Sequence, residues 1–258
     1  MYKYFFTSIL LLLSAELFAE GVNFQSTDDF FKKGITLNSN KQYREALPYL
    51  TQAAEKNHAQ ASYILYVMYS NGLGGTIDKE ASNKWLRKSA ELGYADAEHY
   101  LGHVYQNGDG VTKSNSLALE WFLKAATKND TESMYHYAIA LHNGQDIEQN
   151  QDEAYQWFEK LAPLLIDKAK KGDMKSAHHF YVMHNKGYGM ERDIKTAYEG
   201  FRYLAEKNYA ESQYELGWLY YLGRHVDQDL PQARQWWTLA AEDGHAGAKH
   251  FLKKQGWN

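Results

Sequence analysis

Apolar residues recur along the chain at a fixed interval. An aromatic series advances in steps of 36 residues and resumes after a step of 79, at Tyr49, Trp85, Trp121, Trp157 and Trp236. The next position is apolar in every copy: Leu50, Leu86, Phe122, Phe158, Phe201 and Trp237. Small residues stand three before and five after the aromatic position, as Ala118 and Ala126 do around Trp121. Spacings of three, four and five predict one apolar face of an α-helix, on which the small residues let a second helix pack closely.

Capping residues stand at both ends of these helices. Ahead of each one after the first is a residue type that accepts hydrogen bonds from the free amides of a first helical turn: Asp78, Ser114, Asn150, Asp193 and Asp229. Behind each one is Asn or Gly, which tolerate the left-handed backbone that ends a helix: Asn57, Gly93, Asn129, Gly172, Asn208 and Gly244. We therefore predict a helix between each such pair.

A further helix precedes each of these, so that each repeat is a helix pair. Its core column is Leu65, Leu101, Tyr137, Phe180, Leu216 and Leu252, and it ends at Gly72, Gly108, Gly144, Gly187 or Gly223. In three repeats a second Gly follows two residues later, as Gly110 follows Gly108. Such pairs also occur in phosphate-binding loops, but these end helices and do not follow strands, so a structural role is predicted. We call the earlier helix of each pair the first helix and the later one the second helix.

The run Leu101-Gly102-x-x-Tyr105-x-x-Gly108-x-Gly110-Val111, followed by Ser114, Ala118, Trp121-Phe122 and Ala125-Ala126, resembles the Sel-1-like repeat, a relative of the tetratricopeptide repeat. The match is good over residues 58–128 and 209–244. It is weaker over 130–208, where Phe180-Tyr181 replaces Leu-Gly and Gly200 replaces Trp. The resemblance implies an all-α fold: a right-handed α/α solenoid of antiparallel helix pairs, with about thirteen helices.

The expected organisation is one continuous solenoid from about residue 27. Residues 20–57 form a lead-in and a unit that resembles a plain tetratricopeptide repeat, and residues 58–258 form the Sel-1-like repeats with a capping helix at the C-terminal end. Seven extra residues lie between Ala162 and Gly172. They extend a helix by nearly two turns and keep its phase. Both a drifted repeat and a partner-specific feature fit this insertion.

Residues 1–19 resemble a secretory signal. Lys3 precedes an apolar run from Phe5 to Leu13, and Ala19 offers a small residue before the cut. The run is too short to span a bilayer comfortably. An uncleaved anchor and a plain N-terminal helix are the alternatives. We expect cleavage after Ala19 and a periplasmic or secreted mature chain with no integral membrane span.

Composition excludes several classes of function. With 32 acidic and 28 basic residues the net charge is -4, whereas a nucleic-acid binder needs a basic stripe. No cysteine is present, which excludes disulfides, thiol nucleophiles and cysteine-based zinc sites. Nucleophile elbows, P-loops and His-Glu-x-x-His motifs are absent as well. We predict no catalytic residue, no small-molecule cofactor and no nucleic-acid partner.

Histidines offer the one candidate for metal binding. His99 and His103 stand four apart on a helix and could supply two ligands, but zinc needs three or four and no third ligand is visible in the sequence. No metal site is therefore predicted. His178, His179 and His184 also stand near one another in the sequence, and for them too no metal site is predicted. His184 occupies a column otherwise held by Tyr or Leu, which predicts a buried and hydrogen-bonded imidazole.

Similarity to tetratricopeptide units implies that first helices line a concave face. On the first helices, the side chains at positions that the core does not need are the predicted partner-binding residues: Tyr63, Val67, His99, His103, Tyr135, His142, His178, Tyr214, Trp218, Tyr221 and His250. Aromatic residues are enriched at binding hot spots. Packing of the same side chains against neighbouring helices is the alternative. The histidines also suggest binding that changes between about pH 5 and 7.

The resulting hypothesis is an exported scaffold or adaptor for a protein or peptide. Exported proteins of the Sel-1-like class also include periplasmic immunity proteins that neutralise secreted lipase effectors, which is the alternative that the resemblance implies. A hydrolase of the β-lactamase type is the third alternative. It is disfavoured because the relatives linked to that chemistry are rich in cysteine, and this chain has neither cysteine nor a nucleophile motif.

Overall fold

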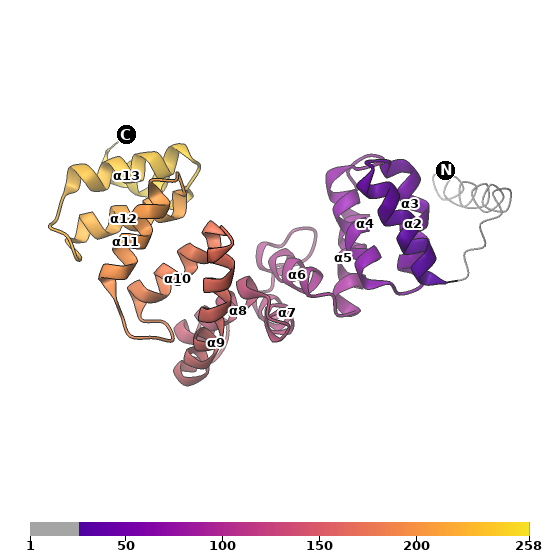
Figure 1. Cartoon of the computed structure of the whole chain (residues 1–258), viewed down its shortest axis with the longest axis horizontal. Coiled ribbons are helices and arrows are strands. Elements are labelled where there is room, and N and C mark those ends of the chain that lie inside the picture. Colours follow the sequence, from indigo (N-terminus) through magenta and orange to yellow (C-terminus); the bar gives the residue numbers. More distant parts are fainter. Residues whose placement is uncertain (1–25, 258) are drawn as a thin grey trace. The chain divides into compact units, whose positions relative to one another are not determined.

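The computed structural model describes residues 26–257, so the predicted leader and its cleavage site lie outside the described residues. Over this range the chain forms thirteen α-helices and no strand (Figure 1). The helices are α2 (Thr27–Ser39), α3 (Tyr43–Glu55), α4 (Ala59–Asn71), α5 (Lys79–Glu91), α6 (Ala95–Asn107), α7 (Asn115–Thr127), α8 (Thr131–Asn143), α9 (Gln151–Lys170), α10 (Met174–Lys186), α11 (Ile194–Ala205), α12 (Ala210–Leu222), α13 (Leu230–Glu242) and α14 (Ala246–Gln255). The predicted all-α repeat solenoid is confirmed.

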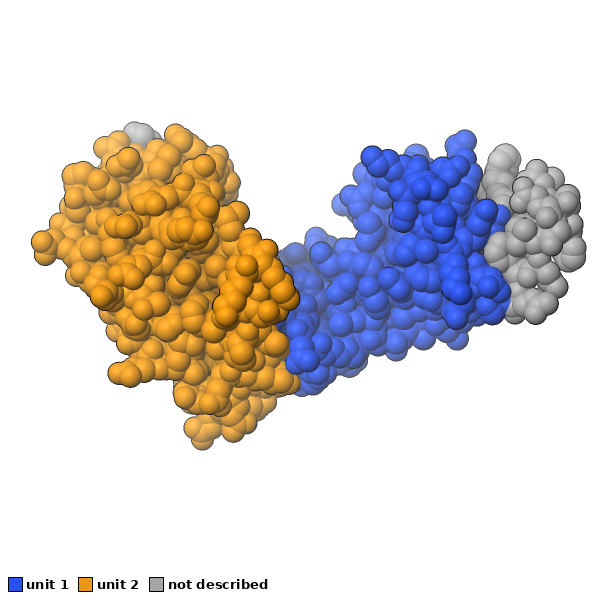
Figure 2. All heavy atoms as spheres, in the orientation of Figure 1, with its two compact units in different colours: residues 1–133 blue, residues 134–258 orange. Residues whose placement is uncertain are grey.

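The helices group into two compact units, residues 1–133 and 134–258 (Figure 2). Unit 1 contains α2 to α7 and the first turn of α8, and unit 2 contains the rest of α8 and α9 to α14. Within each unit, helices that follow one another in the sequence pack together, from α2 on α3 to α6 on α7 and from α9 on α10 to α13 on α14. Contacts between neighbours in sequence are the mark of a repeat protein.

Both predicted capping columns are confirmed. The side chains of Asp78, Ser114, Asn150, Asp193 and Asp229 accept hydrogen bonds from backbone amides in the first turns of α5, α7, α9, α11 and α13. The terminating residues have left-handed backbone, with φ of 65° at Asn57 and 82° at Gly93. Asn and Gly adopt such backbone with less strain than most residues, which explains why they recur there.

The aromatic position of the repeat is buried in Tyr49 and Trp85 but not in the later Trp residues. The column after the aromatic series is buried throughout, with Phe122 1% and Trp237 0% exposed. Trp121 itself is only half-buried, and its ring lies under Lys124, whose Nζ is 3.6 Å from the ring centroid. Its place on the predicted apolar face predicts that Trp121 fills the core, and the half-buried ring contradicts that prediction. Its neighbour Phe122 points between the helices, while Trp121 lies on the flank of α7 beneath a lysine stem.

The repeat in unit 2 that matches the sequence pattern least well has a small residue at one position where others are large, and a large residue at another where others are small. Gly200 stands in the slot that Trp occupies in four other repeats, and a Cβ atom there would collide with the ring of Tyr181. Tyr181 in turn occupies a position where other repeats have Gly102 or Gly217. The ring of Tyr181 on α10 thus fills space beside α11 that the missing Trp leaves open.

The seven-residue insertion lengthens one helix, as predicted. Helix α9 has 20 residues where most others have 13, which accounts for all seven. Leu161 and Leu165 are buried, so the apolar face continues through the inserted turns. No helix among residues 26–257 combines the length and the apolar character needed to cross a membrane.

Candidate functional site

In unit 1, the predicted partner-binding residue Tyr63 lies in a cluster of tyrosines. It is half-buried on α4, with its ring centroid 5.1 Å from that of Tyr94 and 6.1 Å from that of Tyr100. Burial, followed by the nearby Tyr100 and Asp96, raises the pKa of Tyr63 well above its usual range. The phenol therefore stays protonated and can donate a hydrogen bond. Val67, one turn later on α4, is half-buried.

His99 and His103 lie together on α6. Their ring centroids are 4.7 Å apart and the rings meet edge to face. His99 is only 8% exposed, and its Nδ1 lies 3.2 Å from Asp130 Oδ1 and 3.0 Å from Ser133 Oγ. Burial alone would raise the pKa of Asp130, but hydrogen bonds from His99 and Ser133 outweigh it and hold that pKa well below its usual range. Little of the His99 ring is left for a partner to contact.

In unit 2, Tyr135 and His142 on α8 both belong to a stack of rings. The ring of Tyr135 lies parallel to that of His179 at 4.2 Å. His142 meets the edge of Tyr188 at 4.7 Å, and Tyr188 stacks on the core residue Phe158 at 4.7 Å. Burial, the largest influence, raises the pKa of Tyr135 above its usual range. These two predicted site residues therefore also pack the interior of their repeat.

His178 on α10 is buried and neutral. It is 8% exposed, and its Nδ1 lies 2.9 Å from Ser212 Oγ. Burial, followed by the nearby His179 and His245, lowers the pKa of His178 to about 3. The prediction that the histidine column titrates between about pH 5 and 7 is therefore wrong for this residue. Desolvation holds its imidazole uncharged.

The buried His178 predicts a loss of stability on acidification. In the unfolded chain a histidine has a pKa of about 6.5. The folded value of about 3 is lower, so the unfolded state binds more protons between these two values. The stabilisation is complete above about pH 6.5 and declines as the pH falls towards 3, by ~2 kcal/mol between pH 6.5 and 5. Urea denaturation at pH 7 and pH 5 measures it. His178→Gln should lose this part of the pH dependence, and an unchanged dependence in that variant would contradict the assignment.

His184 differs from its prediction. It is half-buried on α10, and its Nδ1 is buried with no hydrogen-bond partner among the described residues. The expectation of a hydrogen-bonded imidazole was therefore wrong for Nδ1. Burial lowers the pKa of His184, which favours the neutral ring, and Phe180 contacts that ring edge to face at 4.7 Å.

Three predicted site residues meet on α12. Trp218 contacts Tyr214 and Tyr221, with ring centroids 6.1 and 5.6 Å away. Trp218 also packs on the core residue Trp237 at 5.1 Å and on Phe251 at 4.9 Å. The alternative reading, packing against neighbouring helices, thus applies to part of the Trp218 ring. His250 on α14 is exposed.

A cavity of about 320 Å³ opens beside these rings. Its lining combines Tyr214, Trp218 and Leu222 from α12 with Asn185 and Lys186 at the end of α10, together with Glu215, Leu219 and Arg224. Leu222 is 45% exposed. Burial raises the pKa of Glu215, and Lys186 opposes this rise. The cavity therefore offers aromatic and aliphatic side chains together with two cations and one carboxylate.

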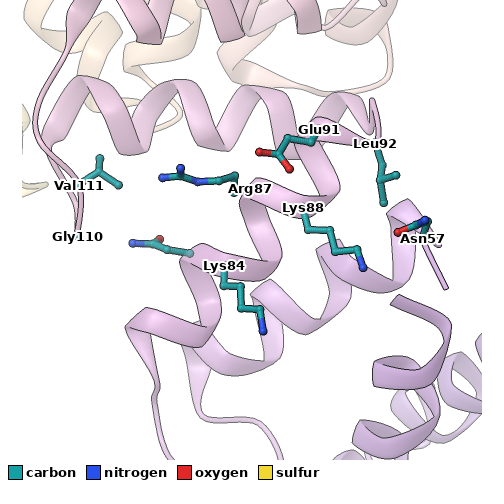
Figure 3. A pocket seen from close by; sticks show the side chains of 9 residues that line it. Asn57, Lys84, Arg87, Lys88, Glu91, Leu92, Gly110 and Val111 are labelled. Atoms are coloured by element: carbon teal, nitrogen blue, oxygen red, sulfur yellow. The ribbon is translucent and has the colours of Figure 1, made fainter. Parts of the chain in front are cut away.

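A second cavity, of about 590 Å³, lies in unit 1 on the side of the second helices (Figure 3). Lys84, Arg87, Lys88 and Glu91 line it from α5, with Gly110 and Val111 from the loop after α6. Lys84 and Lys88 also lie over the ring of Trp85, at 5.4 and 5.8 Å. The spacing of these charges along α5 matches a solvated helix face, which is why the sequence did not single them out.

The helix pairs, their glycine stops and their core columns correspond to a known repeat. A family model, the Sel1 repeat, matches residues 31–58, 61–94, 95–130, 131–162, 176–209 and 210–245. The chain belongs to the Sel1 repeat family. Sel1 repeats form a scaffold fold that typically serves protein interaction. The first matched segment lies in the stretch that we interpreted as a tetratricopeptide-like unit.

Solved structures of Sel1 repeat proteins resemble this one. A Sel1 repeat protein from Oxalobacter formigenes is 27% identical over 85% of each chain, with a TM-score of 0.65. The protein c5321, a protective antigen of uropathogenic Escherichia coli with an SLR fold, is 28% identical over 88% of this chain, with a TM-score of 0.59. This Sel1 chain spans 48% of the length of c5321. A search of the curated proteins found no match.

An immunity protein from Pseudomonas aeruginosa, Pa5087, is 18% identical to this Sel1 chain. The likeness covers 77% of this chain and 73% of that one, with a TM-score of 0.41. So distant a likeness carries no argument about a shared function.

Proposed function

We propose that the protein is an exported adaptor that binds a protein or peptide partner through first-helix side chains, with the α12 cavity as the main contact. The cavity beside Tyr214 and Trp218 supports this proposal, because it joins rigid aromatic rings to the exposed Leu222. Large aromatic rings bury much area at little entropic cost, which suits binding hot spots.

The charges around the cavity indicate the chemistry of the partner. Lys186 and Arg224 line it with exposed side chains. An apolar side chain that enters the cavity while a neighbouring carboxylate meets these cations would match it in shape and charge. We therefore propose a partner segment with an apolar residue flanked by Asp or Glu.

The binding prediction concerns Leu222→Asp and Trp218→Ala. A carboxylate at residue 222 would replace the exposed apolar side chain and repel the acidic residues proposed for the partner, and loss of the Trp218 ring should weaken binding by ~2 kcal/mol, or about 30-fold. Crosslinking in the cell envelope captures bound proteins and so identifies the partner. Titration calorimetry then measures the affinity of each variant for that partner. Tyr203→Ala is the matched control, because Tyr203 is 56% exposed on the second helix α11.

Thermal melts accompany the affinities, since Trp218 also contacts Trp237 and its loss will lower stability. Leu222→Asp is the cleaner variant for this reason. Normal binding by Leu222→Asp, or equal loss of binding in Tyr203→Ala, would place the contact elsewhere. Recovery of a secreted lipase as the captured partner would specify the adaptor as an immunity protein.

Export is part of the proposal. It rests on Lys3, the apolar run from Phe5 to Leu13 and Ala19, which together resemble a secretory signal. N-terminal sequencing of the protein recovered from the periplasm or medium should begin at Glu20. A chain that begins at Met1 in the membrane fraction would contradict both the cleavage and the location.

A further inference from the structure

Two imidazoles and a carboxylate converge in unit 1, between α6 and the first turn of α8. His99 Nε2 lies 3.8 Å from Glu132 Oε2, and His103 Nε2 lies 4.0 Å from Glu132 Oε1. One potential ligand atom from each residue lies within 4.8 Å of the other two. Glu132 is the third ligand that the sequence could not supply, because it comes from the next repeat.

The partner of Nδ1 in each imidazole determines whether Nε2 carries the proton of the ring or its lone pair. His99 Nδ1 faces Asp130 Oδ1 at 3.2 Å, and an ionised carboxylate only accepts hydrogen bonds. Ser133 Oγ lies 3.0 Å from the same nitrogen and can accept or donate. A tautomer of His99 with its proton on Nδ1 fits the contact with Asp130 and leaves the lone pair of Nε2 on the side of Glu132. His103 Nδ1 faces the carbonyl oxygen Oε1 of Gln106 at 3.3 Å, so the same orientation follows for its ring.

This arrangement brings acceptors together. With both Nδ1 atoms acting as donors, both Nε2 atoms have a lone pair on the side of the Glu132 carboxylate. A divalent cation between the three groups would accept a lone pair from each. Two neutral imidazoles and one carboxylate form an established ligand set for zinc, and a carboxylate behind a ligating histidine is the usual outer-shell support.

We propose that His99, His103 and Glu132 bind a divalent transition-metal ion of the zinc class, with Asp130 orienting His99. Metal–ligand bonds of about 2.0–2.1 Å place tetrahedral ligands roughly 3.4 Å apart. The separations of 3.8 and 4.0 Å are slightly wider, and the His103 and Glu132 side chains, 27% and 28% exposed, have room to turn inward. Three protein ligands leave the fourth position open to water or to a group from a partner.

A second repeat shows how the site differs from ordinary packing. His178 occupies the position of His99 and contacts Ser212, as His99 contacts Ser133. In each unit the contacting histidine and serine are 34 residues apart in the sequence, so this contact is a feature of the repeat.

What differs is one of the three proposed ligands and the residue that orients His99. In the second repeat Val182 stands in the place of His103 and Tyr209 in the place of Asp130, whereas Glu211 keeps the carboxylate of Glu132. Among the described residues, the set of three ligand-type side chains occurs only in unit 1. His103 is thus specific to one repeat, as expected of a binding site rather than of a packing requirement, whereas an aspartate recurs at the position of Asp130 as Asp173.

Zinc titration of the full chain by calorimetry at neutral pH tests the proposal. We expect saturable binding of one ion, a rise in melting temperature, and an absorption spectrum typical of four-coordinate cobalt when Co²⁺ replaces Zn²⁺. His103→Ala and Glu132→Gln should each weaken zinc binding at least tenfold, while His225→Ala, which removes an exposed loop histidine, should leave it unchanged. Asp130→Asn keeps the hydrogen-bond acceptor and should weaken binding less than the ligand variants do.

Two results would overturn the proposal. One is the absence of saturable zinc binding, which would leave the cluster as contacts between neighbouring helices. The other is affinity in His103→Ala and Glu132→Gln equal to that of the unaltered chain, or an equal loss in His225→Ala. His103 and Glu132 are half-buried, so melting curves of their variants without metal show whether folding persists. His99→Ala is avoided because that ring is buried.

Discussion

Phe122→Ala is expected to lower the free energy of unfolding by about 3–5 kcal/mol, the range for loss of a buried aromatic ring. Phe122 is 1% exposed on α7 and contacts His103 at a centroid distance of 5.0 Å. Removal of its ring leaves a cavity between α6 and α7 that the packed helices cannot close fully. Urea denaturation followed by circular dichroism measures the loss.

Trp121→Ala is the matched control, one residue earlier on the same helix. Its half-buried ring rests under Lys124 and should contribute only ~1–2 kcal/mol, through partial burial and a cation–π contact. The variant that loses more free energy of unfolding shows whether Trp121, as the sequence pattern predicts, or Phe122, as the structure shows, fills the core. A larger loss for Trp121→Ala would mean that Trp121, and not Phe122, fills the core of this repeat.

Gly200→Ala is expected to destabilise unit 2 by ~1–3 kcal/mol, although alanine favours helices. The added methyl group would collide with the ring of Tyr181 on the neighbouring helix. In a Tyr181→Ala background the space is open, and the same substitution should stabilise by up to ~1 kcal/mol through helix propensity. The sign of the effect should therefore reverse between the two backgrounds.

A double-mutant cycle of these two positions measures the coupling directly. Urea denaturation of the four proteins gives the free energies. Additive effects, with Gly200→Ala equally harmful in both backgrounds, would mean that Tyr181 does not fill the space of the missing Trp. Strong coupling would explain how the least regular repeat of this Sel1 chain keeps a packed core.

The sequence alone determined the helix pairs and their ends. Spacing on one helix face and capping chemistry are local properties, so Asp78 and Gly93 mark the limits of α5 without knowledge of its neighbours. The extension of α9 was readable for the same reason, because seven residues preserve helical phase. Membership of the Sel1 repeat family followed from the same recurrent positions.

Only the tertiary structure decided which side chains face the core and which of them meet. The choice between Trp121 and Phe122 depends on the angle at which α6 approaches α7, and that angle is not encoded in the spacing along one helix. The predicted partner-binding column likewise divided into buried rings such as His178 and accessible ones such as Tyr214, because burial depends on neighbouring helices.

The sequence alone could not bring together the candidate metal ligands either. His99 and His103 were visible as a pair because one helix carries both, whereas Glu132 is about 30 residues away and adjoins them only through the stacking of repeats. Local periodicity thus specified the elements of this protein. Contacts between elements, which depend on packing angles and on the side chains of the next repeat, determined its cavities and its cluster of ligands.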